Sequence, residues 1–107
     1  MEETRFGPSG NGAAFYDAGF KSSVDAPKWL KSIGLNAYEY SFGRGFTMGF
    51  DKAELLGKAG NENSVLISVH APYYINFANP SDEMFEKSLK YVLTSFEYLR
   101  HFGGKHV

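Results

Sequence analysis

One segment decides the fold: Val65-Leu-Ile-Ser-Val-His-Ala-Pro-Tyr-Tyr-Ile-Asn-Phe-Ala-Asn-Pro80. It begins as an apolar run interrupted only by Ser68, which is typical of a buried strand in a parallel sheet. His70 stands at the C-terminal end of that strand, and Ala71 to Asn79 form the loop that follows it. Ligands bind at this edge of α/β folds. The segment therefore predicts both a central strand and a binding edge.

A second strand is predicted upstream, and its two faces differ in character. Over residues 35–42 the small or polar side chains alternate with aromatic ones: Ala37, Glu39 and Ser41 against Tyr38, Tyr40 and Phe42. In a closed barrel the first set would point inward and the aromatic set toward the helices. Glu39 is then a possible interior carboxylate. A solvated or paired strand residue is an equally open interpretation.

Helical segments separate the predicted strands. Residues 26–33 form a helix with Asp25 as its N-cap and Gly34 at its end. A weaker helix over residues 50–58 is ended by Gly60. The clearest helix follows Ser81 and stops at Gly103-Gly104. Its predicted apolar stripe consists of Phe85, Leu89, Val92, Phe96 and Leu99.

The order of the elements predicts a parallel α/β fold. A short strand over residues 4–7 opens the chain, and residues 105–107 begin another extended segment. Strand and helix thus alternate three times, at a spacing suited to βαβ units. A TIM barrel, (β/α)8, takes ~250 residues. We interpret residues 1–107 as the N-terminal part of a single TIM-barrel domain, with about three βα units and the start of a fourth strand.

Composition limits the function classes. The net charge of −1 gives no general attraction to nucleic acid or to an anionic membrane, although a local patch would not show in the total. The chain has no cysteine, so a metal site would need histidine and carboxylate ligands. No apolar run is long enough to span a membrane, and no signal pattern opens the chain, so we expect no membrane partner and a cytoplasmic protein.

The central segment also carries a family resemblance. Residues 69–80, Val-His-Ala-Pro-Tyr-Tyr-Ile-Asn-Phe-Ala-Asn-Pro, are followed by a long helix and by Gly-Gly-Lys-His-Val107. This arrangement closely resembles the endonuclease IV family, which belongs to the xylose-isomerase-like TIM barrels. The resemblance covers the whole chain in order, and its specific part is His70 to Pro80.

The resemblance implies a zinc-dependent phosphodiesterase that nicks DNA at abasic sites during base excision repair. Members hold up to three zinc ions at the C-terminal face of the barrel. His70 lies at the position of a zinc-ligating histidine, Tyr73 at that of a DNA-contacting tyrosine, and Arg44 in the loop that carries a residue wedged into the duplex. The other ligands would lie beyond Val107, so we expect residues 1–107 alone to be inactive. His101 and His106 match no ligand position.

Two alternatives stay open. The first strand ends in Gly7-Pro8-Ser9 where the family has a histidine-containing turn, and the loop around Arg44 is rich in Gly and Phe. These departures favour a sugar isomerase or epimerase of the same superfamily, acting on a small sugar. The other alternative is a non-catalytic βα fragment that self-associates through its open sheet edges.

Overall fold

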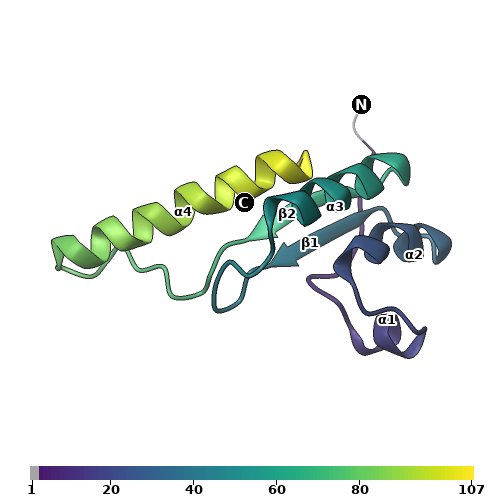
Figure 1. Ribbon diagram of the computed structural model, residues 1–107, viewed down its shortest axis with the longest axis horizontal. Coiled ribbons are helices and arrows are strands. Elements are labelled where there is room, and N and C mark those ends of the chain that lie inside the picture. The colour runs from purple at the N-terminus through teal and green to yellow at the C-terminus, as the bar shows by residue number, and fades with distance from the viewer. Residues whose placement is uncertain (1–2) are drawn as a thin grey trace.

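The computed structural model describes residues 3–107 as a layered α/β arrangement (Figure 1). Two parallel strands lie side by side, and the two longest helices, α3 and α4, run along one side of them. The elements in chain order are α1 (Ala13–Asp17), the 3-10 turn η1 (Ser23–Asp25), α2 (Ala26–Ser32), β1 (Ala37–Ser41), α3 (Phe50–Glu62), β2 (Leu66–His70) and α4 (Asp82–Phe102). The predicted parallel α/β arrangement is confirmed for two strands, β1 and β2, and the helices that follow them.

The parallel pair is extended on both sides by less regular segments. β1 pairs with β2 in a register that sets Glu39 opposite Ser68. On the outer side of β1, an isolated parallel bridge joins Ser9 to Glu39, and the Gly10 amide donates to the Glu39 carbonyl at 2.8 Å. On the outer side of β2, the Val69 amide donates to the His106 carbonyl at 3.0 Å. The segments therefore lie in sequence order across the sheet, as successive strands of a barrel do.

The predicted first strand is wrong in detail. Residues 4–7 form no regular strand, and the pairing with β1 extends to Gly10. The Phe6 carbonyl accepts hydrogen bonds from the Asn36 and Ala37 amides, but Pro8 has no amide hydrogen to donate to the ladder. The Tyr38 hydroxyl donates to Asn11 Oδ1 at 2.7 Å, and this hydrogen bond ties the loop over residues 8–12 to β1.

The two faces of the strand pair differ as the alternation predicts. Tyr38, Ile67 and Val69 are buried beneath the helices, whereas Ser68 and Glu39 on the opposite face are only partly covered. The core consists of Phe15, Ala26, Leu30, Tyr38, Phe42, Met48, Ala53, Leu56, Val65, Ile67, Val69, Tyr98, Leu99 and Phe102. Burial also raises the pKa of the Tyr38 phenol to about 12.

Helix α3 is longer than predicted because Gly60 lies inside it, as Gly57 does, rather than at its end. A Cβ at position 57 would stand 2.7 Å from the His101 carbonyl oxygen of α4. One at position 60 would stand 2.9 Å from the Val65 carbonyl oxygen. The two glycines therefore allow close approach to α4 and to β2, and the packing outweighs their low helix propensity.

The predicted start of α2 also needs correction. Asp25 occupies the N-cap position of α2, but its side chain makes no capping hydrogen bond. Its backbone is already helical because η1 runs directly into α2. The capping side chain is Ser22, whose hydroxyl accepts from the Val24 amide at 3.4 Å. Gly34, with φ of +86°, ends the helix as predicted.

Helix α4 begins and ends as predicted, but its apolar stripe does not all face the core. Ser81 accepts from the Met84 amide, and Gly103 is left-handed with φ of +68°. Of the predicted stripe, Leu99 is buried, whereas Phe85 and Phe96 are 46% and 51% exposed. The buried face runs through Leu99, Tyr98 and Phe102, which belong to the predicted apolar arc, and through Ser88 and Ser95, which do not. The small Ser88 side chain accepts a hydrogen bond from the loop after β2, a contact that hydrophobicity alone does not reveal.

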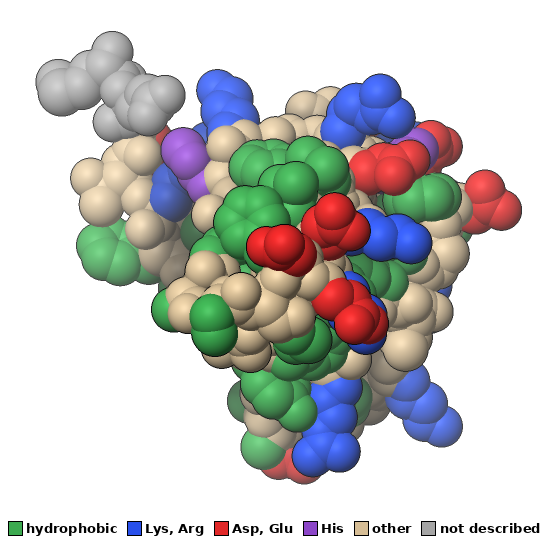
Figure 2. All heavy atoms as spheres, turned by 90° about the vertical axis from the view of Figure 1, so that its left-hand side faces the viewer, with side chains coloured by type: hydrophobic (Ala, Val, Ile, Leu, Met, Phe, Trp, Pro, Cys, Tyr) green, Lys and Arg blue, Asp and Glu red, His purple; other side chains and the backbone are tan. Residues whose placement is uncertain are grey.

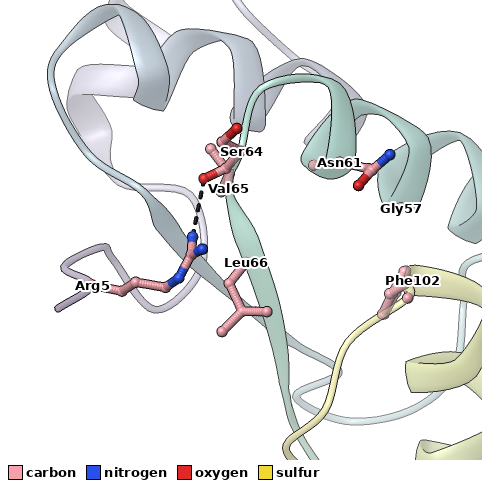
Figure 3. A pocket seen from close by; sticks show the side chains of 9 residues that line it. Arg5, Gly57, Asn61, Ser64, Val65, Leu66 and Phe102 are labelled. Carbon is pink, nitrogen blue, oxygen red and sulfur yellow. Dashed lines mark hydrogen bonds between the residues drawn. The ribbon is translucent and has the colours of Figure 1, made fainter. Parts of the chain in front are cut away.

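A hollow of about 340 Å³ lies at the N-terminal edge of the strand pair and is lined in part by Arg5, Asn61 and Phe102 (Figure 3). Arg5 Nη1 donates to the Asn36 and Ser64 carbonyl oxygens, both at 3.0 Å. These carbonyls precede β1 and β2, so one guanidinium joins the starts of both strands. In barrels this edge serves stability rather than catalysis.

The close packing of α3 on α4 gives a test of the fold. We expect Gly57→Ala to lower the free energy of unfolding by about 1–3 kcal/mol, because its Cβ meets backbone atoms that have no room to move aside. This loss would occur even though alanine is favoured over glycine in helices by ~1 kcal/mol. Urea unfolding measures it. Asn61→Ala on the exposed face of α3 is the matched control and should stay within about 0.5 kcal/mol. Equal stability of Gly57→Ala and the wild-type chain would contradict the packing.

Candidate functional site

The C-terminal edge of the strand pair carries the candidate site. β1 ends at Ser41 and β2 at His70, and the register places these two residues opposite each other. The loops that follow, residues 42–49 and 71–81, lie at the same end of the sheet (Figure 1). Whatever binds beyond the strand ends therefore meets both loops and His70 together.

His70 is exposed, and one of its ring nitrogens is fixed. Its Nδ1 lies 2.9 Å from the carbonyl oxygen of Ala71. Because a carbonyl oxygen only accepts, Nδ1 carries the hydrogen, and the lone pair of the neutral ring is on Nε2. Metal-ligating histidines commonly donate their second ring nitrogen to a carbonyl in this way. His70 thus has the orientation and the exposed nitrogen that a metal ligand needs.

Tyr73 and Arg44 come from loops that touch each other. The Tyr73 amide donates to the Gly43 carbonyl oxygen at 3.3 Å, which joins the loop after β2 to the loop after β1. The Tyr73 side chain is 64% exposed, and Arg44 is exposed as well. The structure therefore brings Tyr73 and Arg44 to one rim, with His70 at the strand end below them.

The loop after β2 is anchored to α4 rather than free. The Asn76 amide donates to the buried Ser88 hydroxyl at 2.9 Å. The Tyr74 ring packs edge-on against Tyr91 with centroids 4.7 Å apart. Sequence reasoning missed both anchors, and the only signal was a serine placed within the apolar face of a helix. Tyr73 is consequently presented by a held loop, with its neighbour Tyr74 turned toward the helix.

Glu39 lies on the partly exposed face of the strand pair and is hydrogen-bonded on both sides. Ser9 Oγ donates to Glu39 Oε1 at 3.1 Å, and Ser68 Oγ donates to Glu39 Oε2 at 3.4 Å. A hollow of about 210 Å³ opens beside these groups. The two hydrogen bonds agree with the interpretation of Glu39 as a paired strand residue. Glu39 also lies on the face of β1 opposite the helices, which is the face that the interior-carboxylate interpretation requires. The two serines were not predicted as partners.

The remaining histidines take no part in the candidate site. His101 is on α4, where Nδ1 is 3.0 Å from Glu54 Oε1 and the ring packs on Phe50 with centroids 4.5 Å apart. His106 joins the sheet through its backbone. Within residues 3–107, no three histidine, aspartate or glutamate side chains stand close enough together to hold a metal ion. An imidazole such as His70 suits a metal as one ligand, but the described residues place no further ligands beside it.

The surface around the loops is mixed in character. Figure 2 faces this end of the molecule and shows hydrophobic side chains gathered in its centre, with several acidic groups among them. The exposed hydrophobic residues of this region include Tyr73, Phe77 and Phe85. Asp82 and Glu83 open helix α4 nearby. Among residues 3–107, no helix combines the length and the apolar character needed to cross a membrane.

Comparison with known proteins identifies the family. Residues 27–107 match the family described as xylose isomerase-like TIM barrel, so the chain belongs to that family. It is also 31% identical over 74 residues to the uncharacterized protein MJ0133 of Methanocaldococcus jannaschii. That match covers 69% of this chain and 26% of the relative, so the aligned part of the chain spans about a quarter of the relative's length.

The anchoring of the loop gives a second test. In Ser88→Ala the Asn76 amide loses its acceptor at a cost of about 1 kcal/mol, so we expect its hydrogen exchange to speed up by roughly fivefold to tenfold. Exchange followed by NMR measures this directly. Ser95→Ala is the matched control, because that buried hydroxyl donates to the Tyr91 carbonyl of its own helix and does not touch the loop. An unchanged exchange rate at Asn76 in Ser88→Ala would refute the anchor.

Proposed function

We propose that the complete protein is an endonuclease IV-like phosphodiesterase acting at abasic sites in DNA. The main support for this proposal is that His70, Tyr73 and Arg44 lie together at the C-terminal edge of the parallel strands. Family membership supports a barrel whose ligand edge is this one. Residues 1–107 would supply the N-terminal part of that single barrel domain.

His70 would be one ligand of a zinc site. The hydrogen bond from Nδ1 to the Ala71 carbonyl would hold the ring in place and leave Nε2 as the nitrogen for the metal. Zinc bound there would supply Lewis-acid stabilisation of negative charge on the phosphate oxygens. Up to three ions are expected in the complete barrel by the family resemblance, and their remaining ligands would lie outside this chain.

Tyr73 and Arg44 would hold the DNA. An arginine at a loop tip suits a phosphate oxygen or the space left in a distorted duplex. An exposed tyrosine ring offers a flat surface beside an unstacked base. To be cut, an abasic nucleotide must leave the base stack. Its extrusion costs little free energy because no base pair has to be broken. Two joined loops give these side chains a common, fixed platform.

Nicking of abasic DNA tests the proposal. We expect the complete natural protein to cut a duplex carrying one abasic site and to lose this activity in chelator. His70→Ala should reduce the rate by at least about 100-fold, since loss of a ligand exceeds the 10–100-fold effect of losing a ligand's partner. Gel analysis of the cut strand measures both. His101→Ala, on the outer helix, is the control and should retain the activity. Absence of chelator-sensitive nicking would refute the nuclease.

A separate expectation concerns residues 1–107 alone. One imidazole does not hold zinc tightly, and the described residues offer no group of three ligands. We therefore expect no nicking by this chain in the same assay, at any zinc concentration that leaves the DNA intact. Turnover by residues 1–107 would show that the other ligands are not required.

A second candidate is a sugar isomerase or epimerase of the same family. It is favoured by the Glu39 carboxylate with its two serine partners, a polar arrangement suited to sugar hydroxyls. The acidic groups near the loops also suit a neutral ligand better than DNA. Incubation of the complete protein with aldoses and ketoses, followed by NMR, tests it. Interconversion without nicking would select this candidate.

A further inference from the structure

We propose that Ser9, Glu39 and Ser68 form a subsite that binds a sugar hydroxyl group beneath the His70 edge. The inference rests on the proposed function in one respect, which is that the substrate approaches the C-terminal edge of the strands. It adds a residue set and a ligand chemistry that the family resemblance does not provide.

The three side chains come from three neighbouring segments and are held together by backbone pairing. Ser9 bridges to Glu39, and Glu39 pairs with Ser68 in the β1–β2 register. Their side chains therefore project from the same face, and their hydrogen bonds of 3.1 and 3.4 Å follow from that alignment. The cluster is fixed by the sheet itself rather than by mobile loops.

The Glu39 carboxylate still has capacity to accept. A carboxylate offers about four lone-pair sites, and one serine hydroxyl occupies a site on each oxygen. Glu39 is only partly buried, and the hollow of about 210 Å³ beside it extends toward the starts of the strands, where Arg5 and Ala37 also line it. A ligand hydroxyl can thus reach an oxygen without breaking either serine contact.

The position of the cluster connects it to the His70 edge. Ser68 precedes His70 by two residues, so both side chains face the same side, about 7 Å apart along the strand. This spacing is close to the length of a sugar ring with its substituents. A ligand held at the strand end can therefore place one hydroxyl on Glu39.

The Glu39 carboxylate determines which ligand group can bind beside it. The Glu39 carboxylate only accepts hydrogen bonds, so it favours an O–H donor. Arg5 lines the same hollow, and its guanidinium donates to the Asn36 and Ser64 carbonyl oxygens. Barrel interiors are usually filled by branched apolar side chains, so a glutamate with two serines is not explained by packing. A sugar hydroxyl would reach Glu39 along the face that Ser68 shares with His70, while a phosphate would lie at the rim near His70 and Arg44.

Two sources share this hydroxyl chemistry. An abasic nucleotide carries a hydroxyl on C1 of its deoxyribose, where the base was attached, and a free ketose or aldose carries several. The tetrahydrofuran analogue of the abasic nucleotide lacks the C1 hydroxyl but keeps the ring and the phosphates. Comparison of the two duplexes therefore isolates one hydroxyl.

The test measures binding rather than turnover. Fluorescence anisotropy of the complete protein in chelator gives Kd for a duplex with a natural abasic site and for one with tetrahydrofuran. We expect wild-type protein to prefer the hydroxyl-bearing duplex by about tenfold, the size typical of a hydrogen bond to a charged group. Glu39→Gln should remove the preference, and Glu62→Gln on the exposed end of α3 should keep it.

A second arm uses free sugars. Titration of the complete protein with D-ribose and D-fructose, followed by NMR, should shift the Ser68 amide in wild-type protein and not in Glu39→Gln. Ser68→Ala keeps the carboxylate but removes one donor, and it should lose part of the preference. It serves as the reserve variant if Glu39→Gln does not fold.

The outcomes separate the subsite from the nuclease. A hydroxyl preference that disappears in Glu39→Gln supports the subsite, with abasic DNA as its source. Free-sugar binding that depends on Glu39, without nicking of DNA, supports the subsite and rejects the nuclease. Nicking combined with an unchanged preference in Glu39→Gln overturns the subsite and leaves the nuclease standing. No effect of Glu39 in either arm also overturns the subsite.

Discussion

The parallel pairing of β1 with β2 is the constraint on which the rest of the structure depends. Its register sets Glu39 against Ser68 and Ser41 against His70. Because side chains alternate along a strand, this register also sends Val69 to the opposite face, beneath the helices. A shift of one residue would exchange the faces, burying the histidine and exposing the core.

On the apolar side of the strands, two glycines of α3 determine how closely the helices pack. Gly57 brings α3 against α4, and Gly60 brings it against the start of β2. Helix α4 in turn holds the loop after β2 through Ser88. Tyr73 is thus positioned by a chain of contacts that begins in the core. The polar side is left open, and its groups come from three adjacent segments of the sheet.

Sequence predicted the element order, the central strand and the two faces of β1, because these depend on local alternation and on cap residues. It placed the end of α3 wrongly, since Gly60 matches a helix stop and its actual contact, with Val65, is tertiary. It also assigned Phe85 and Phe96 to the core side of α4, because both sides of that helix are apolar. The serine partners of Glu39 depend on strand register, which a single sequence does not encode locally.

The central claim is that His70 at the end of β2 is a metal ligand and that this edge is the active face. The most direct measurement is a crystal structure of the complete natural protein grown with zinc, with anomalous scattering recorded at the zinc edge. We expect an anomalous peak about 2.0–2.1 Å from His70 Nε2, with Nδ1 still donating to the Ala71 carbonyl. Zinc bound elsewhere, with the His70 ring free of metal, would contradict it.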